Sequence, residues 1–173
     1  QVWYDGLPDG STIARYLDIT DQKRQEVDLR ESEERYALAI AGTNDGIWDW
    51  DIRTHRTYRS PRWYEIIGYD ADEIEPQTEP SMVSFLEYVL PEDRDKVREA
   101  LLAHIHERAP YDIEYRLLHK SGDSLWVRGK AQAVWGENNE PLHMAGSISD
   151  ISDLKREEEK RRLSEKRYEL AIA

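Results

Sequence analysis

Residues 147–156 read Ser-Ile-Ser-Asp-Ile-Ser-Asp-Leu-Lys-Arg, and this stretch decides how the chain folds. Its first half alternates apolar and polar residues, as a half-buried strand does, and its second half begins the dense charge of a solvated helix. Residues 15–24 read Arg-Tyr-Leu-Asp-Ile-Thr-Asp-Gln-Lys-Arg and show the same transition 132 residues earlier. Each stretch therefore predicts the last strand of a sheet that runs directly into a helix.

The two copies stay in register from this transition to the end of the chain. The residues that recur identically 132 positions later are Asp18, Ile19, Asp21, Lys23, Arg24, Glu26, Arg30, Ser32, Glu33, Arg35, Tyr36, Leu38, Ala39, Ile40 and Ala41. Further upstream, Val2-Trp3 recurs as Val134-Trp135. A fixed period indicates a repeated module, and a period of roughly 130 residues fits a small domain with its connector better than a solenoid unit.

The repeat divides the chain into four expected segments. Residues 1–20 would be the C-terminal hairpin of a preceding unit, and residues 21–43 a helical linker. Residues 44–152 would form one complete domain, and residues 153–173 a second helical linker that leads into a next unit. Neither linker carries a clean heptad pattern, which favours a weak dimer seam or a partly solvated strut over a strong coiled coil.

Composition excludes several classes of function. The net charge of −12 argues against nucleic acid and against an anionic membrane surface as partners. No apolar run approaches the roughly 20 residues that cross a bilayer, so no membrane insertion is expected in this chain. The chain has no cysteine, which rules out disulfides, thiolate metal sites and cysteinyl-flavin chemistry and fits a reducing cytoplasm.

The pattern of residues 44–152 predicts an α+β domain with the element order β-β-α-α-α-β-β-β. Two strands lead, three strands close, and one face of the strands is polar, which indicates one antiparallel sheet with the helices on its other face. The helical turns expected between residues 69 and 90 are broken by Pro76 and Pro80. The other expected elements are Ile47–Ile52, Arg56–Arg59, Pro61–Gly68, Pro91–Arg108, Tyr111–Leu117, Leu125–Trp135 and Leu142–Ile151, after a hairpin of Gln1–Tyr4 and Ile13–Ile19.

Several segments, in this order and at this spacing, resemble the PAS domain of the subtype that ends in a PAC segment. They are Ser32-Glu33-Glu34-Arg35-Tyr36, Gly46-Ile47-Trp48-Asp49-Trp50-Asp51, Ser60-Pro61-Arg62-Trp63, Ile67-Gly68-Tyr69, Pro91-Glu92-Asp93-Arg94, Glu114-Tyr115-Arg116-Leu117, Lys120-Ser121-Gly122-Asp123, Trp126-Val127 and Asp150-Ile151-Ser152. The resemblance covers residues 33–153. The family ends in Asp-Ile-Thr, and Ser152 keeps the hydroxyl group of that threonine.

The resemblance implies a fold and a role. The fold would be a five-stranded antiparallel sheet with short helices on one face, flanked by N- and C-terminal linker helices. The role would be that of a sensor or dimerisation module, forming a homodimer through the flanking helices or the sheet. Such modules precede a histidine kinase of a two-component system or a cyclic-di-nucleotide enzyme in bacterial signal transduction.

Candidates for catalysis do not meet the requirements of the chemistry. The stretch from His104 to Pro110 is similar to the phosphoacceptor box of histidine kinases, but it is one residue short and lies at a helix end. His104 and His106 are two residues apart on a helix, so they face different directions and cannot chelate one metal. No phosphate loop, zinc signature or Ser-His-Asp arrangement is visible. The sequence therefore predicts a module without enzymatic activity.

Aromatic and apolar residues are the candidates for a ligand pocket. An apolar cavity with a few polar groups is typical of small-molecule sites, and a filled core is the alternative that we expect more strongly. The candidate ligand-binding residues are Trp48, Trp50, Trp63, Tyr88, His104, Tyr115 and Met144. His104 is also a candidate haem ligand, although well-known haem sensors of this family carry that histidine nearer the start of the helix, where this chain has Lys96–Arg98. Non-covalent flavin is the other cofactor alternative.

The two strand-to-helix transitions hold the candidate signal-coupling residues Asp18, Thr20, Asp150 and Ser152. The hydroxyl groups of Thr20 and Ser152 are suited to N-cap the following helices. The resemblance implies that such an Asp–Thr pair anchors the exit helix to the sheet. Asp150 is expected to bind a basic partner, for which the candidates are Arg128, Lys130 and Arg53. Three functions stay open: a sensory relay, a cofactor-carrying gas or redox sensor, and a ligand-free dimerisation spacer.

Overall fold

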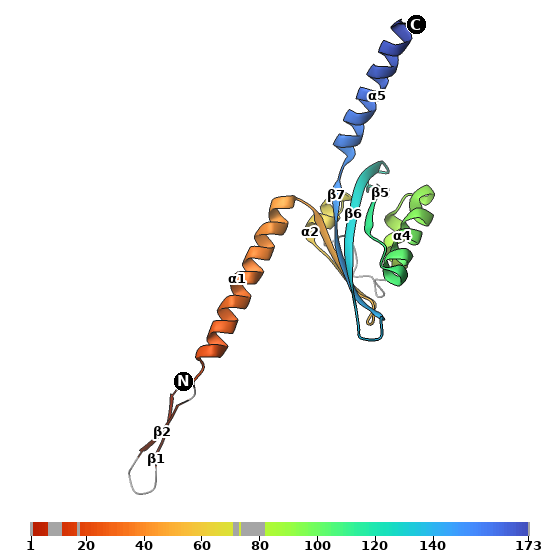
Figure 1. The fold of residues 1–173 in the computed structure, drawn as a ribbon. Coiled ribbons are helices and arrows are strands. Elements are labelled where there is room, and N and C mark those ends of the chain that lie inside the picture. Colours follow the sequence, from red (N-terminus) through yellow and green to blue (C-terminus); the bar gives the residue numbers. More distant parts are fainter. Residues whose placement is uncertain (1, 7–11, 17, 71–72, 74–81, 173) are drawn as a thin grey trace. The chain divides into compact units, whose positions relative to one another are not determined.

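The computed structural model describes residues 2–6, 12–16, 18–70, 73 and 82–172. The chain divides into two compact units, Gln1–Thr43 and Asn44–Ala173, and each has its own sheet (Figure 1). The helical turns expected around Pro76 and Pro80 lie outside the described residues.

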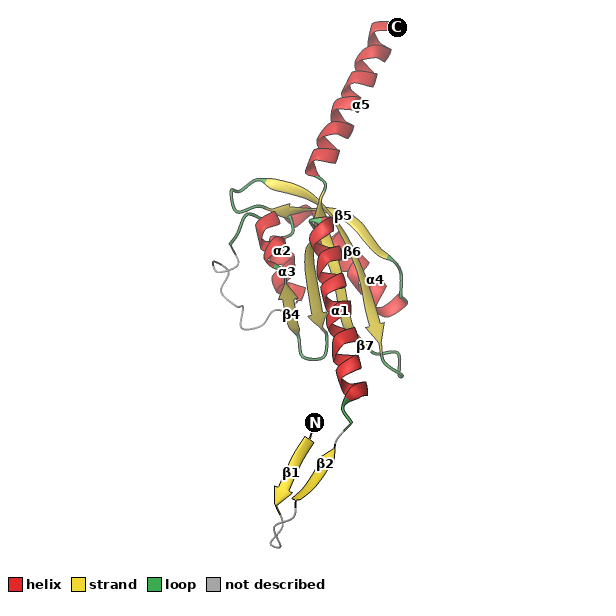
Figure 2. Cartoon of the chain, turned by 90° about the vertical axis from the view of Figure 1, so that its left-hand side faces the viewer, coloured by secondary structure: helices red, strands yellow, loops and turns green. Residues whose placement is uncertain are grey.

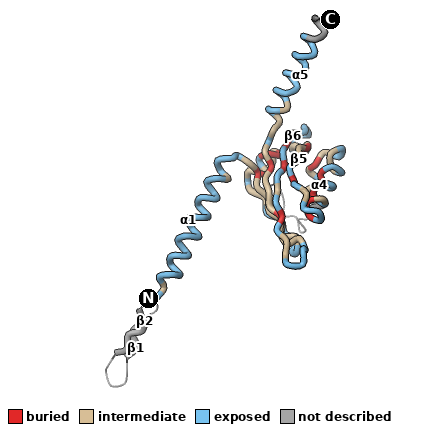
Figure 3. The backbone as a smooth tube through the Cα atoms, viewed as in Figure 1, coloured by how far each residue is buried: buried red, intermediate tan, exposed pale blue. Residues whose placement is uncertain are grey.

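The first unit is a β-hairpin followed by one helix. Strands β1 (Val2–Gly6) and β2 (Thr12–Tyr16) pair antiparallel, and α1 spans Thr20–Thr43. Apart from half-buried Ile40, every residue of α1 is exposed (Figure 3). Ion pairs one turn apart, such as Lys23–Glu26 and Arg30–Glu34, lie along this solvated helix.

The second unit contains the predicted five-stranded sheet, in the order β4-β3-β7-β6-β5 with all neighbours antiparallel. Its strands are β3 (Gly46–Asp51), β4 (Arg56–Arg59), β5 (Tyr111–Leu118), β6 (Ser124–Trp135) and β7 (Pro141–Asp150). Its helices are α2 (Pro61–Ile66), α3 (Met82–Tyr88), η1 (Pro91–Asp93), α4 (Arg94–Glu107) and α5 (Ser152–Ile172). Figure 2 shows α2, α3 and α4 gathered on one face of the sheet. The predicted fold class and topology are confirmed.

The alternation in β6 sets the two faces of this sheet. Val127, Gly129 and Ala133 are buried on the helix side, whereas Arg128 and Lys130 are exposed on the other side, as the sequence predicts. Gly129 has a packing reason, because a Cβ atom there would lie 2.9 Å from the ring of Tyr115 on the neighbouring strand. The glycine therefore lets a large, fully buried ring lie flat against the sheet.

Helices α2 and α4 cover the sheet through the apolar stripes that the sequence predicts. In α4, Val97, Leu101, His104 and Ile105 are buried. Helix α2 begins at Ser60, whose side-chain oxygen accepts the Trp63 amide, and it places Trp63 in the core with 1% of its surface exposed. Truncating a buried ring of this size typically lowers the free energy of unfolding by about 3–5 kcal/mol.

A bidentate ion pair joins the start of α4 to the sheet. Asp93 Oδ1 accepts Arg116 Nη2 at 2.7 Å, and Asp93 Oδ2 accepts both Arg116 Nε at 2.9 Å and the Arg116 backbone amide at 2.8 Å. The Asp93 side chain is 14% exposed. The hydrogen bonds from Arg116 hold the pKa of Asp93 below its usual value of 3.8.

We expect Asp93→Asn to lower the free energy of unfolding by roughly 1.5–3 kcal/mol at neutral pH, because it removes charge-assisted hydrogen bonds. Since the folded-state pKa is depressed, this stabilisation is fully present above pH 3.8 and is lost as the pH falls through the folded-state value. Urea denaturation of both proteins between pH 7 and pH 3 tests this. Asp95→Asn is the control, because the Asp95 side chain is 79% exposed. Equal losses in the two variants would contradict the prediction.

Candidate functional site

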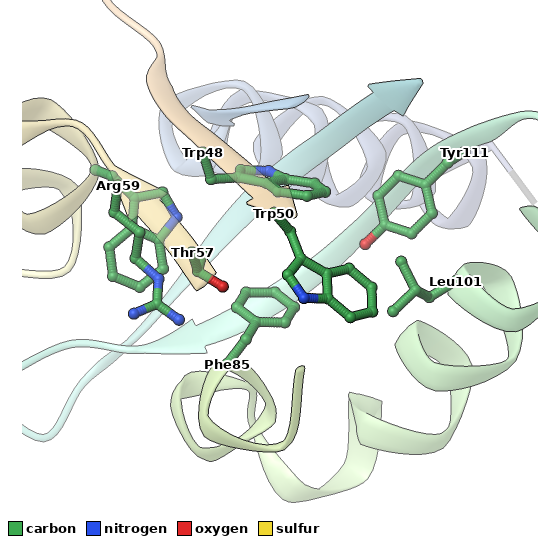
Figure 4. Close-up of a pocket in the computed structure, with 8 residues that line it drawn as sticks. Trp48, Trp50, Thr57, Arg59, Phe85, Leu101 and Tyr111 are labelled. Carbon is green, nitrogen blue, oxygen red and sulfur yellow. The ribbon is translucent and has the colours of Figure 1, made fainter. Parts of the chain in front are cut away.

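A partly open pocket lies between the sheet and its helices (Figure 4). Its cavity volume is about 40 Å³. The lining residues come from β3, β4, α2, α3, α4 and β5, and they are Trp48, Trp50, Thr57, Arg59, Trp63, Phe85, Leu101 and Tyr111. A water molecule needs about 10–15 Å³ by the same measure, so the cavity has room for about three waters.

Three of the predicted ligand-binding residues, Trp48, Trp50 and Trp63, line this pocket. Tyr88 is not one of the lining residues named above, and it contacts the Trp63 ring edge-on with 5.5 Å between the centroids. Tyr115 and Met144 are fully buried in the core beside the pocket. Their role in ligand binding therefore stays a prediction.

Sequence reasoning missed the pocket residues Thr57, Arg59, Phe85, Leu101 and Tyr111. In the four-residue strand β4, Arg56 and Tyr58 are exposed, while Thr57 and Arg59 are half-buried on the pocket side. Alternation along β4 was the signal that could have found Arg59, although a charged residue in a short strand usually indicates a solvent-facing position.

Few polar groups reach the pocket. The guanidinium group of Arg59 lies 4.8 Å from the Trp63 ring centroid and 5.9 Å from that of Tyr88. The indole Nε1 of Trp50 is buried and has no hydrogen-bond partner among the described residues. Burial raises the pKa of Tyr111, whose hydroxyl group interacts with that of Tyr115, so the phenol stays neutral. The described wall of the pocket is therefore mainly apolar, with the guanidinium group of Arg59 as its cation and Trp50 Nε1 as a hydrogen-bond donor that has no described partner.

The second candidate region is the junction between β7 and α5. The Trp126 amide donates to Ser152 Oγ at 3.0 Å, and the Trp126 carbonyl oxygen accepts the Ile151 amide at 2.9 Å. Asp150 Oδ1 accepts the Ser152 amide at 2.8 Å and so caps the first turn of α5. The junction is thus an extension of the β6–β7 ladder in which a serine side chain replaces a backbone group.

Side chains add a second connection at this junction. Lys155 Nζ lies 2.6 Å from Glu114 Oε2 on β5, and this bond raises the pKa of Lys155. Lys155 Nζ and the Arg116 guanidinium carbon also lie over the Trp126 ring, 5.5 Å and 5.4 Å from its centroid. Because Arg116 binds Asp93, a continuous set of contacts joins the start of α4 to the first turn of α5.

The prediction that Asp150 binds one of three basic side chains is wrong. Arg128 Nε and Nη2 donate to the two carboxylate oxygens of Asp112, at 2.6 and 2.7 Å, and Lys130 Nζ lies 3.8 Å from the same carboxylate. Arg53 lies 3.8 Å from Asp51. In the ladder Asp150 pairs with Val127 and therefore belongs to the face opposite Arg128 and Lys130. Its carboxylate binds backbone instead, which is a capping role.

The first transition repeats this local geometry. The Thr20 amide donates to Asp18 Oδ1 at 2.9 Å, as the Ser152 amide does to Asp150. The first helical bond of α1, from Lys23 N to Ile19 O, is 2.9 Å, and its counterpart from Lys155 N to Ile151 O is also 2.9 Å. All four predicted coupling residues thus lie at helix starts of one kind, and their role in signalling stays a prediction. The predicted N-cap role of the Thr20 and Ser152 hydroxyl groups is wrong, because the first helical bonds make Ile19 and Ile151 the N-cap residues and the Ser152 hydroxyl group bonds to the sheet instead.

Comparison with known proteins assigns the family. The model of the PAS fold family matches residues 56–148, which is more than half of the chain. This chain belongs to the PAS fold family. A sensory box histidine kinase/response regulator from Burkholderia thailandensis E264 has a similar crystal structure, with a TM-score of 0.66 and 39% identity over 80% of this chain and 99% of that one.

Other relatives of this PAS domain belong to diguanylate cyclases. The N-terminal domain of a diguanylate cyclase with PAS/PAC sensor from Marinobacter aquaeolei has the same fold, with a TM-score of 0.54 and 21% identity over 62% of this chain and 95% of that one. The probable diguanylate cyclase DgcE of Escherichia coli K12 is 29% identical over 143 residues, which is 83% of this chain. The chain spans only 12% of the length of DgcE.

The described part of the PAS domain does not fit haem ligation by His104. His104 Nδ1 lies 2.5 Å from the Ala109 carbonyl oxygen, and His104 Nε2 accepts the Ala133 amide at 2.9 Å. Both ring nitrogens are therefore engaged, and the tautomer with hydrogen on Nδ1 satisfies both bonds. The cavity is also small beside the roughly 300–1,000 Å³ that larger ligands require, which disfavours flavin in this conformation.

Among the residues that the structure describes, no group of three His, Asp or Glu side chains is placed to hold a metal ion. None of the helices in the described ranges is both long and apolar enough to cross a membrane.

We expect His104→Phe to lower the free energy of unfolding by about 2–4 kcal/mol, because the buried Ala133 amide and the Ala109 carbonyl lose their partner. The exposed neighbour gives a control, His106→Phe, which should stay within about 0.5 kcal/mol. Adding hemin should give the same absorption spectrum with wild type and His104→Phe. A Soret band that depends on His104 would contradict this structural role.

Proposed function

We propose that this PAS domain is a sensory relay module of a bacterial signal-transduction protein, either a sensor histidine kinase or a diguanylate cyclase. The module itself would carry no enzymatic activity and would act in the cytoplasm, as the composition suggests. Signals would reach it on the helix side of the sheet, where the pocket lies. Its output would be a change in the position or stability of the first turn of α5.

The observation that carries this proposal is the attachment of α5 to the sheet. Ser152 and Ile151 bond to both backbone groups of Trp126, and Lys155 bonds to Glu114. Beyond Lys155, every described side chain of α5 as far as Tyr168 is exposed. The contacts of the helix with the sheet are therefore concentrated in one turn, so a shift of β6 or β5 would act on the whole helix through that turn.

Relatives support the output side of the proposal. The similar proteins include a histidine kinase/response regulator and the probable diguanylate cyclase DgcE, of which this chain spans only 12%. We propose the same placement here, as one part of a longer chain, with residues 153–173 leading into a further unit. Coupling free energies between sites in such systems are typically about 1–3 kcal/mol, which a few hydrogen bonds can supply.

We also propose that the chain is a segment of a tandem array that dimerises. Residues 1–20 would then be the last hairpin of a preceding unit, residues 21–43 its exit linker, and residues 44–152 the complete domain. The shared capping geometry at Asp18–Thr20 and Asp150–Ser152 supports this arrangement. Exposed apolar side chains on the linkers, among them Leu38 and Leu163, support a homodimer through these helices.

We expect Ser152→Ala to loosen the first turn of α5, because Trp126 loses a hydrogen bond that typically contributes about 0.5–1.5 kcal/mol. Hydrogen exchange of residues 152–156 should become faster, with little change in the sheet. In the full-length parent protein the same change should weaken the response of the output domain to its signal. Asp150→Ala, which removes the cap of this turn, should have the same effect and leave folding largely intact.

Matched controls lie further along the same helix. Ser164→Ala, which changes an exposed serine, is the control for Ser152→Ala. Lys160→Ala, which changes an exposed lysine, is the control for Lys155→Ala, which removes the bond to Glu114. Neither control should alter exchange at the junction or output in the parent. Normal regulation in both Ser152→Ala and Lys155→Ala would show that the junction carries no signal.

A further inference from the structure

Among the residues that the structure describes, Arg59 is a cation without a countercharge. The chain has 36 acidic and 24 basic residues, yet among the described residues no carboxylate pairs with Arg59, and its contacts are with two aromatic rings. Burial raises the pKa of Tyr88, so its phenol group is neutral and supplies no negative charge to Arg59. The Arg59 side chain is half-buried and lines the pocket (Figure 4).

Trp50 provides a second, independent sign that the pocket receives an acceptor. Its Nε1 atom is buried in the pocket wall and donates to no described residue. Buried donors in folded proteins are almost always paired, because an unpaired one loses its bonds to water without compensation. A ligand with oxygen atoms would satisfy this group, whereas a purely apolar ligand would leave it unpaired.

The remaining wall limits the charge and the size of that ligand. None of the lining residues that the structure describes is acidic, and apart from Thr57, Arg59 and Tyr111 they are apolar or aromatic. A dicarboxylate would bring a second charge that no lining residue neutralises, and that would be unfavourable in an apolar cavity. A cavity of about 40 Å³ admits only a few non-hydrogen atoms unless the walls move.

We propose that this pocket binds a short monocarboxylate, whose carboxylate pairs with Arg59 and accepts a hydrogen bond from Trp50 Nε1 while its apolar tail lies against Phe85 and Leu101. A planar guanidinium group can bind a carboxylate through two parallel hydrogen bonds, and that geometry favours an acid over a neutral analogue. This assignment rests on the proposed sensory function and names the chemical class of its input. It also accounts for the presence of an arginine at a half-buried position of a four-residue strand.

Isothermal titration of the 173-residue chain with sodium butyrate and with butyramide tests the assignment. The two probes have nearly the same size and differ in charge. Butyrate should bind with a dissociation constant below about 1 mM, and butyramide should bind at least about tenfold more weakly. Arg59→Gln should weaken butyrate binding at least about tenfold and leave butyramide unchanged.

The control variant is Arg56→Gln, in the same strand but on its exposed face, and it should bind butyrate as the wild type does. Trp50→Phe keeps an aromatic wall without the donor and should weaken butyrate binding by a few-fold. Thermal melting of each variant shows whether it is folded. Because Arg59 stacks on Trp63, a melted Arg59→Gln would be replaced by Arg59→Lys, which keeps the charge and should retain part of the affinity.

Three results would overturn the assignment: equal affinity for butyrate and butyramide, no effect of the Arg59 variants, or no binding of any monocarboxylate from acetate to hexanoate. These results are distinct from failure of the relay. If Ser152→Ala weakens regulation while butyrate does not bind, the anion assignment is wrong and the relay stands. If butyrate binds through Arg59 but Ser152→Ala leaves regulation normal, the pocket stands and the junction does not carry its signal.

Discussion

The structure depends on the hydrogen bonds that Ser152 and Ile151 make with the backbone of Trp126. An antiparallel ladder normally ends where one strand departs, and its last groups then turn to water. Here the serine hydroxyl completes the ladder while the backbone has already begun a helix. The sheet and α5 therefore share hydrogen bonds, and a helix that is otherwise exposed is held at one end. Helix α5 is therefore attached to the sheet at its first turn, and the rest of its described length is exposed to solvent.

The same junction explains why charge is concentrated around Trp126. The indole ring lies beneath both Arg116 and Lys155, and each cation has its own carboxylate, Asp93 or Glu114. Exposed ion pairs contribute little by themselves, but these two share an aromatic ring between them. The ring joins an ion pair at the start of α4 to one at the start of α5. Arg59 on β4 differs from both cations, since its two aromatic contacts come without a carboxylate from the described part of the chain.

The amino-acid sequence predicts those features of the fold that follow from the periodicity of apolar residues. The alternation in β6, the apolar stripe of α4 and the common face of Trp48 and Trp50 are all local patterns, and the structure confirms them. Pairings between distant elements could not be predicted in this way. The face occupied by Asp150 depends on the register of β7 against β6, and one residue of register reverses the faces. The bonds of His104 to backbone groups likewise depend on where α4 lies over the sheet.

The pocket and the junction meet on β7. Trp48 and Trp50 of β3 pair with Gly146 and Met144, and β7 then continues through Asp150 into α5. A Cβ atom at Gly146 would lie 2.8 Å from the Trp48 ring, so this pocket residue rests directly on the β7 backbone. A ligand that pushes the Trp48 ring toward the sheet would therefore press on the β7 backbone. Under the proposed relay function, a displacement of this strand would act on the helix through the chain itself, because α5 is the continuation of β7. The contacts around Trp126 would then set how far the first turn of α5 moves with β7.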